Sequence, residues 1–160
     1  GYFGPAGGIV AYDKGVTTDG WRYLEINLKS VGRYYSDVGN SSLQAKWSIS
    51  PYSYLAGTSE KMGEGLNNTN FIINKISGES AAKFCKQYSV NGFADWFLPS
   101  KDEALAIFTS LQKGGMSLNN GLTTWTSSEI DTQSAYLVYF GALSTGQKFW
   151  ASEAYPVRRY

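Results

Sequence analysis

The chain has 160 residues and a net charge of +1, contains a single cysteine and lacks histidine. The balanced charge argues against nucleic-acid binding, which needs a strongly basic face, and one cysteine excludes an internal disulfide or a multi-cysteine metal site. The missing histidine removes Ser-His-Asp and Cys-His catalysis and most zinc sites. Hydrophobic residues at 42% predict one globular domain over residues 1–160. No membrane insertion is expected, because no apolar run approaches roughly 20 residues.

The first part of the chain predicts a β-hairpin. Residues 7–13 predict a short strand, residues 17–20 a turn, and residues 21–26 alternate large apolar with polar side chains, the period of a half-buried strand. The periodicity fades over residues 27–65, and two interpretations stay open there: a functional loop, or short elements that the pattern does not reveal. The chain begins at Gly1 without a methionine or an apolar leader, so we expect a processed chain or a fragment.

Two helices are expected in the middle of the chain. Residues 67–70 are Asn-Asn-Thr-Asn, which favours the cap of a helix running to Ile76, with Ile72 on the same face. The second helix spans residues 79–88, where apolar side chains recur at helical spacing. Cys85 lies on this apolar stripe, so we expect a buried structural thiol rather than a reactive one.

Residues 91–103 combine a turn, an aromatic cluster and a helix start. Asn91 and Gly92 tolerate positive φ and predict a tight turn, in which we expect Asp95 to accept backbone hydrogen bonds. Ser100 with Glu103 three residues later is a capping box for a third helix, which ends near residues 114–115. The apolar residues of this stretch are expected to fill the core: Phe93, Trp96, Phe97 and Leu98.

The C-terminal part contains no helical periodicity and predicts four short strands. If Tyr136, Val138 and Phe140 point inward, strand alternation sends Leu137 and Tyr139 outward. Strands, then helices, then strands indicate an α+β fold rather than the alternation of a parallel βαβ fold. The four predicted strands are residues 122–128, 135–140, 147–151 and 155–160.

Taken in order, these motifs resemble the bacterial Lcl C-terminal domain family, which is named after a collagen-like adhesin. The opening is similar over residues 4–15 (Gly-Pro-Ala-Gly-Gly-Ile-Val to Tyr-Asp-Lys-Gly) and 20–25 (Gly-Trp-Arg-Tyr-Leu-Glu). Residues 91–103 look like its central signature, residues 125–129 (Trp-Thr-Ser-Ser-Glu) its next one, and residues 155–158 (Tyr-Pro-Val-Arg) its closing motif. The match covers nearly the whole chain and is weakest over residues 27–60.

The resemblance implies a C-type-lectin-like fold, a twisted antiparallel sheet with paired N- and C-terminal strands and two to three flanking helices. Residues 9–13 are then expected beside residues 156–160. It also implies an extracellular or bacterial cell-surface binding module. The adhesin is associated with sulfated glycosaminoglycan binding and trimerisation. Related C-type-lectin-fold proteins include the variable ligand-binding proteins of diversity-generating retroelements.

Two departures from the family pattern narrow the expected ligand. Tyr155 stands where the family usually has its first closing arginine. Sulfated polysaccharides need clustered cations, and the candidates here are only Lys148, Arg158 and Arg159. The calcium-site tripeptides of true C-type lectins are absent as well. A sulfated polysaccharide is therefore weakly supported as a partner, and no metal or cofactor is expected.

Catalysis is the function that the sequence favours least. A pair of the acidic residues near the signatures, among them Asp95 and Asp102, would be needed for glycoside hydrolysis. The capping box accounts for Glu103, and the positive end of the helix accounts for Asp102. We expect Glu129 to form a partly buried ion pair with Arg158 between adjacent strands. The C-type-lectin fold also hosts formylglycine-generating enzymes, but these need a cysteine pair that this chain lacks.

We therefore expect a non-catalytic module that recognises a protein or glycan ligand through an aromatic-rich C-terminal face. Aromatic faces stack on sugars or pack on proteins, and Tyr139, Lys148, Trp150 and Tyr155 are expected to form an exposed platform. The predicted ligand-binding residues are Tyr139, Lys148, Phe149, Trp150, Ser152 and Tyr155. The predicted structural residues are Asp95, Trp96, Ser100, Glu103, Trp125, Glu129 and Arg158. The alternative is a structural or oligomerisation domain, whose exposed aromatics form contacts between copies as a homo-oligomer.

Overall fold

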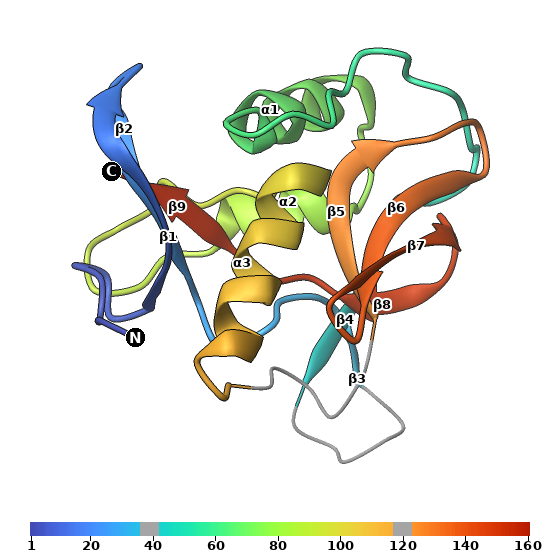
Figure 1. Ribbon diagram of the computed structural model, residues 1–160. Helices are drawn as coiled ribbons and strands as arrows, with labels where there is room; N and C mark the ends of the chain where they lie inside the picture. The colour runs from blue at the N-terminus through green and yellow to red at the C-terminus, as the bar shows by residue number, and fades with distance from the viewer. Residues whose placement is uncertain (36–41, 117–122) are drawn as a thin grey trace.

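The structure is a computed structural model and describes residues 1–35, 42–116 and 123–160. Within these ranges, helices and strands form an α+β fold, as the sequence predicts (Figure 1). The helices are α1 (Gly65–Lys75), α2 (Ala81–Gln87) and α3 (Lys101–Lys113). The strands are β1 (Ile9–Thr18), β2 (Trp21–Ile26), β3 (Tyr34–Tyr35), β4 (Leu43–Lys46), β5 (Thr123–Glu129), β6 (Ser134–Tyr139), β7 (Ala142–Gln147), β8 (Ala151–Glu153) and β9 (Val157–Arg159).

The smaller sheet joins the two ends of the chain in the order β1-β2-β9. The predicted hairpin is confirmed, with Ile9 opposite Ile26 in an antiparallel pair. The C-terminal strand lies on the other side of β2, where Val157 is opposite Ile26 (Figure 1). The expected contact between residues 9–13 and the C-terminal strand is therefore wrong, because β2 separates them and uses both of its edges.

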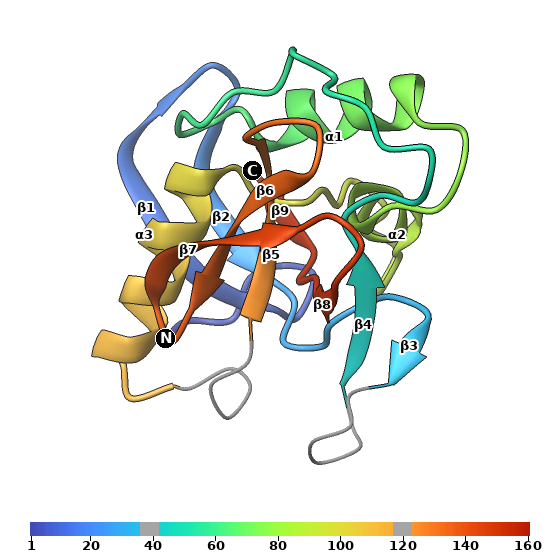
Figure 2. The ribbon, with the colours of Figure 1, turned by 90° about the vertical axis from the view of Figure 1, so that its right-hand side faces the viewer.

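The larger sheet has the order β3-β4-β8-β5-β6-β7 and is antiparallel except for β5 and β8 (Figure 2). Two of its strands, β3 and β4, lie in the long stretch without periodicity, so that stretch does carry short elements. The strand predicted at residues 147–151 is wrong, since residues 148–150 are the turn from β7 to β8. The predicted strand at residues 122–128 corresponds to β5, and residue 122 lies outside the described residues.

The side-chain alternation expected for β6 is correct for Val138, which is buried, and for Tyr139, which is exposed, but wrong for Leu137 and Phe140. Leu137 is buried and packs in the core, whereas Phe140 is 61% exposed. Phe140 belongs to the turn that follows β6, where its φ of 49° and that of Gly141 at 77° define the two-residue loop of the β6–β7 hairpin. Val138 packs in one core cluster and Leu137 in the other, so both faces of β6 are covered and burial does not alternate along the strand.

The helices α3 and α2 each begin at a serine whose side chain accepts a backbone N–H group. α3 has the predicted capping box: Ser100 N–H donates to the Glu103 carboxylate (2.7 Å), and the Glu103 N–H donates to Ser100 Oγ (3.3 Å). α2 begins after Ser80, which accepts from the Lys83 N–H. α1 begins earlier than predicted and lacks a side-chain cap. Asn68, expected in its cap, is buried instead and donates to Ser127 Oγ (3.0 Å).

The hydrophobic core has two clusters, with α3 between the two sheets (Figure 1). The first cluster packs α3 against the terminal sheet, with Phe108 and Leu24 among its members. The second packs α1 and α2 against the larger sheet around Trp47 and Trp125. Cys85 belongs to the second cluster, and its burial raises the pKa of the thiol, as expected for a structural cysteine.

Candidate functional site

The structure separates the six predicted ligand-binding residues into an exposed and a buried group. Tyr139 is 46% exposed, Phe149 46% and Trp150 47%. Their side chains offer apolar area to a partner, since large exposed aromatics that cluster on a surface are typical of binding sites. The other three residues are buried: Lys148, Ser152 and Tyr155.

The turn between β7 and β8 carries a group of neighbouring aromatic side chains, which we call the aromatic surface and define as Tyr52, Phe149 and Trp150. The rings of Phe149 and Trp150 stand edge-to-face at 83°, with centroids 6.5 Å apart. The Tyr52 ring lies 6.4 Å from that of Phe149. Sequence reasoning missed Tyr52, because residues 49–58 have no regular period that would place it near residue 149.

A buried ion pair supports the aromatic surface from below. Lys148 Nζ lies 2.6 Å from a Glu129 carboxylate oxygen, donates to the Ser53 carbonyl (3.0 Å) and lies 4.7 Å from the Trp47 ring centroid. Glu129 also accepts the Leu55 N–H (2.9 Å). The expected exposure of Lys148 is therefore wrong: its ammonium group turns inward because a buried carboxylate needs a cation.

Tyr155 and Ser152 are part of the scaffold beneath the sheet. The Tyr155 ring packs edge-on against Phe108 with centroids 6.2 Å apart, and its hydroxyl donates to Glu153 (2.9 Å). Burial raises the pKa of Tyr155. Ser152 Oγ lies 2.8 Å from Thr123 Oγ1. The expectation that Tyr155 is part of an exposed platform is wrong, because β8 and the segment after it run through the core.

A second aromatic pair lies at the other end of β7. Tyr139 and Phe140, which we call the tip pair, have centroids 4.6 Å apart at 74°. The Gln112 side chain of α3 donates to the Phe140 carbonyl (2.9 Å) and holds the hairpin tip. The six residues of β7 separate the tip pair from the aromatic surface by about 20 Å, at about 3.4 Å per residue. One chain therefore presents two aromatic groups rather than the single predicted platform.

The predicted structural residues take structural positions, although one expected pairing is wrong. Arg158 donates to Asp95 from Nε (2.8 Å) and Nη2 (2.9 Å), and to Glu25 from Nη1 (3.1 Å). Glu129 pairs with Lys148, so the expected ion pair between Glu129 and Arg158 does not form. The hydrogen bond from Arg158 lowers the pKa of Asp95, and this bond takes the place of the backbone contacts expected in the turn.

The glycine-rich N-terminus closes around the same cluster. Glu25 is fully buried and accepts the N–H groups of Ala6 (3.1 Å) and Gly8 (2.7 Å). A Cβ atom at Gly4 would collide with the Glu25 side chain, and one at Gly8 would collide with the Ile26 carbonyl oxygen, so both positions need glycine. The Asn91 side chain, from the predicted turn, donates to the Ala6 carbonyl (2.9 Å). The opening, central and closing motifs of the sequence thus meet at Arg158.

The two signature tryptophans are fully buried and bonded, as expected for structural residues. Trp125 Nε1 donates to the Ala45 carbonyl (2.9 Å), which fastens β5 to β4. Trp96 Nε1 donates to the Phe93 carbonyl (3.1 Å) within the central corner. The Asn91–Gly92 turn is confirmed, with φ values of 52° and 83° and reciprocal backbone bonds between Val90 and Phe93.

The acidic residues weighed for catalysis have structural partners. Glu103 accepts N–H groups from Ser100 and Gly63, and its burial raises the carboxyl pKa to about 7. Asp95 and Glu129 are paired with cations. Within the three described ranges, His, Cys, Asp and Glu side chains form no group of three that would suit a metal ion. None of the helices described is long and apolar enough to cross a membrane.

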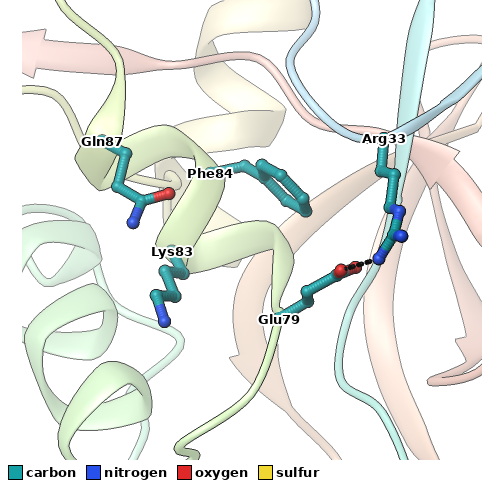
Figure 3. Close-up of a pocket in the computed structure, with 5 residues that line it drawn as sticks. All are labelled: Arg33, Glu79, Lys83, Phe84 and Gln87. Atoms are coloured by element: carbon teal, nitrogen blue, oxygen red, sulfur yellow. Dashed lines mark hydrogen bonds and ion pairs between the residues drawn. The ribbon is translucent and has the colours of Figure 1, made fainter.

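A small hollow lies beside α2 (Figure 3). Its volume is about 230 Å³, and Arg33 and Glu79 pair across its rim. Ligand pockets usually exceed about 300 Å³, so this hollow is too small for most ligands. Sequence reasoning missed it because its rim joins residues 46 positions apart. The residues that line it are Arg33, Glu79, Lys83, Phe84 and Gln87.

The aromatic surface is therefore the candidate site, because its exposed side chains have no structural role that explains them and its base is fixed by buried groups. Comparison of the chain with protein-family models and with curated proteins gives no match.

Proposed function

We propose that the protein is a non-catalytic binding module that recognises a protein or glycan ligand through its aromatic surface. One observation carries this proposal: Phe149 and Trp150 stay about half exposed, at 46% and 47%, directly beside a lysine that is fully buried. A turn that hides its charged residue and shows its apolar ones reverses the usual preference of a soluble surface. Binding of a partner would cover this apolar area and explain the arrangement.

The base of the surface favours recognition because it limits the entropy lost on binding. The Lys148–Glu129 pair and the Ser53 carbonyl hold the turn and residues 53–55 in one arrangement. Side chains that are already ordered lose less freedom when a ligand binds, and aromatic residues have few rotatable bonds. The rings of Phe149 and Trp150 stand edge-to-face, and aromatic rings stack on sugars or pack against protein side chains.

The charges around the surface favour a neutral ligand over a sulfated polysaccharide. Lys148 and Arg158, two of the three cations considered for sulfate binding, are neutralised by buried carboxylates. A sulfated chain requires several accessible cations close together, because its binding depends on charge. A neutral glycan or an uncharged protein patch suits the aromatic surface better.

The fold and the cellular location belong to the same proposal. We propose a C-type-lectin-like fold at the bacterial cell surface or in a secreted protein. The pairing of β9 with the N-terminal hairpin supports it, since the resemblance implies that the chain ends meet in one sheet. The meeting of the opening, central and closing motifs at Arg158 supports it further.

A glycan array and a pull-down from bacterial or host surface extracts test the proposal together. Wild type is expected to bind a ligand in one of the two assays, and Trp150→Ala is expected to lose about tenfold or more in affinity, as hot-spot aromatics do. Tyr35→Ala is the matched control, because Tyr35 is an exposed aromatic (73%) on β3 at the opposite edge of the sheet. Equal binding by wild type and Trp150→Ala would refute the aromatic surface as the site.

A further inference from the structure

The two sheets have four edge strands, and three of them are protected against pairing with another chain. β1 has register shifts and carries Asp13 and Lys14, features that discourage edge pairing. β3 has only two residues. β9 is covered by Phe97, which exchanges backbone hydrogen bonds with Val157 on its free side (2.8 and 2.9 Å). Natural sheets use such devices to prevent association through their edges.

The fourth edge strand, β7, has none of these devices. Its six residues, Ala-Leu-Ser-Thr-Gly-Gln, pair with β6 in an unbroken register and include no charged residue and no proline. Leu143 and Thr145 are exposed on it. Figure 2 shows β7 nearest the viewer, with β6 behind it. Within the described ranges, the recorded backbone bonds of residues 142–146 are those of the pairing with β6.

The hairpin turn decides which backbone groups of β7 are free. In a two-residue hairpin loop, the flanking residues Tyr139 and Ala142 form a hydrogen-bonded pair, and such pairs alternate along the ladder. Ser144 and Gly146 therefore bond to β6. The residues between them, Leu143, Thr145 and Gln147, direct their N–H and C=O groups away from the sheet.

We propose that two copies of this chain pair through β7, antiparallel about a two-fold axis at Thr145. In this orientation the three outward residues of one copy lie opposite those of the other copy. Thr145 is opposite Thr145, and Leu143 is opposite Gln147. This is an isologous contact, which closes as a dimer because the same strand is used by both copies. The Gln147 carbonyl already accepts the Trp150 N–H (2.9 Å). A carbonyl oxygen has two lone pairs, and the second one accepts the N–H of the other copy.

The pairing also brings the two aromatic groups together. Within one chain, the tip pair and the aromatic surface lie at opposite ends of β7. Antiparallel pairing sets the aromatic surface of one copy beside the tip pair of the other, and it does so twice. The dimer therefore joins the half-exposed rings into two continuous patches. The proposal rests on the free edge of β7 and holds whether or not a ligand binds the aromatic surface.

The oligomeric state of single variants tests the pairing. We expect sedimentation velocity over about 1 to 500 µM, the range for a weak dimer, to show wild type changing from monomer to dimer. Thr145→Pro removes an outward N–H and is compatible with an edge strand, so it is expected to stay monomeric with an unchanged circular dichroism spectrum. Thr145→Val keeps the backbone groups and is expected to dimerise as wild type does. A wild type that is monomeric throughout, or a Thr145→Pro dimer, would overturn the proposal.

Cross-linking gives a second readout that does not depend on a proline. Thr145→Cys places two thiols opposite each other across the axis, and mild oxidation is expected to convert most of the protein to a disulfide-linked dimer. Val16→Cys is the control, since Val16 is 55% exposed on the protected edge strand β1. The native Cys85 is fully buried and should not react. Equal cross-linking of the two variants would contradict pairing through β7. Binding of an added extended peptide without self-association would also overturn the dimer, because the partner of β7 would then be a different chain.

Discussion

Arg158 and Lys148 are both buried cations, but they stabilise different parts of the molecule. Arg158 joins β9 to β2 and to the central corner, so its partners all belong to the scaffold that brings the chain ends together. Lys148 joins the turn after β7 to β5 and to the loop at residue 53, directly below the aromatic surface. One cluster determines how the fold closes, and the other determines how a surface is presented.

The two clusters also differ in how their charges are balanced. Arg158 contacts two carboxylates, and one of them, Asp95, has a side chain that is 52% exposed. Lys148 contacts a single carboxylate whose side chain is 1% exposed, and its other neighbours are a carbonyl and an aromatic ring. Loss of Arg158 should therefore disrupt the packing of several motifs at once, while loss of Lys148 should act mainly on the loop above it.

Arg158→Met is expected to have the largest effect on stability. It leaves the Glu25 carboxylate fully buried without a cation, and breaking a buried pair in this way costs about 3–5 kcal/mol. The measurement is urea denaturation at neutral pH. Arg22→Met is the matched control, because the Arg22–Asp13 pair is exposed, and ion pairs in contact with solvent contribute little to stability. A loss of similar size in both variants would remove the distinction between the Arg158 cluster and an ordinary surface pair.

Lys148→Met is expected to cost less, about 2–4 kcal/mol, because Lys148 pairs with one carboxylate whereas Arg158 pairs with two. The carboxylate that Lys148 leaves, Glu129, also accepts the Leu55 and Ala56 N–H groups. The effect of Lys148→Met should also be local. Hydrogen exchange at those two amides should speed up relative to the amides of β2, whereas Arg158→Met should show the reverse order. If Lys148→Met leaves exchange at Leu55 and Ala56 unchanged, the ion pair does not order the loop beneath the aromatic surface.

The sequence predicts the elements whose signals are local. The hairpin of β1 and β2, the Asn91–Gly92 turn and the Ser100–Glu103 capping box each depend on residues a few positions apart, and the structure contains all three. The strands β3 and β4 escape prediction because they are short and their order depends on β8, more than 100 residues later.

The exposure of the C-terminal residues depends on contacts that no local pattern reveals. The partner of Lys148 lies 19 residues away in sequence, and the partners of Arg158 lie 63 and 133 residues away. The prediction placed Lys148 on the surface as part of an exposed aromatic platform, and lysine is indeed rarely buried. One available signal went unused: the glycine-rich start of the chain exposes N–H groups that need a buried acceptor, and Glu25 is that acceptor.

Glu103 differs from the carboxylates that pair with Arg158 and Lys148, because it is buried without an ion-pair partner among the described residues. Burial raises its pKa to about 7 from the ordinary value of 4.5, so the folded protein binds a proton that the unfolded chain releases. The stabilising effect of this proton is full below about pH 4.5 and disappears as the pH rises through about 7. Wild type should therefore lose stability between about pH 5 and pH 8, by up to about 3 kcal/mol at about 1.4 kcal/mol per pKa unit.

Glu103→Gln isolates this smallest of the three effects. A glutamine keeps an oxygen that accepts the Ser100 N–H but does not titrate, so the slope of stability against pH should become flatter than in wild type. Glu153, whose pKa burial also raises, contributes the same sign in both proteins and cancels in the difference. The chain has no histidine to titrate in this range. Urea denaturation at several pH values measures both slopes, and parallel slopes would mean that Glu103 stays ionised in the folded state.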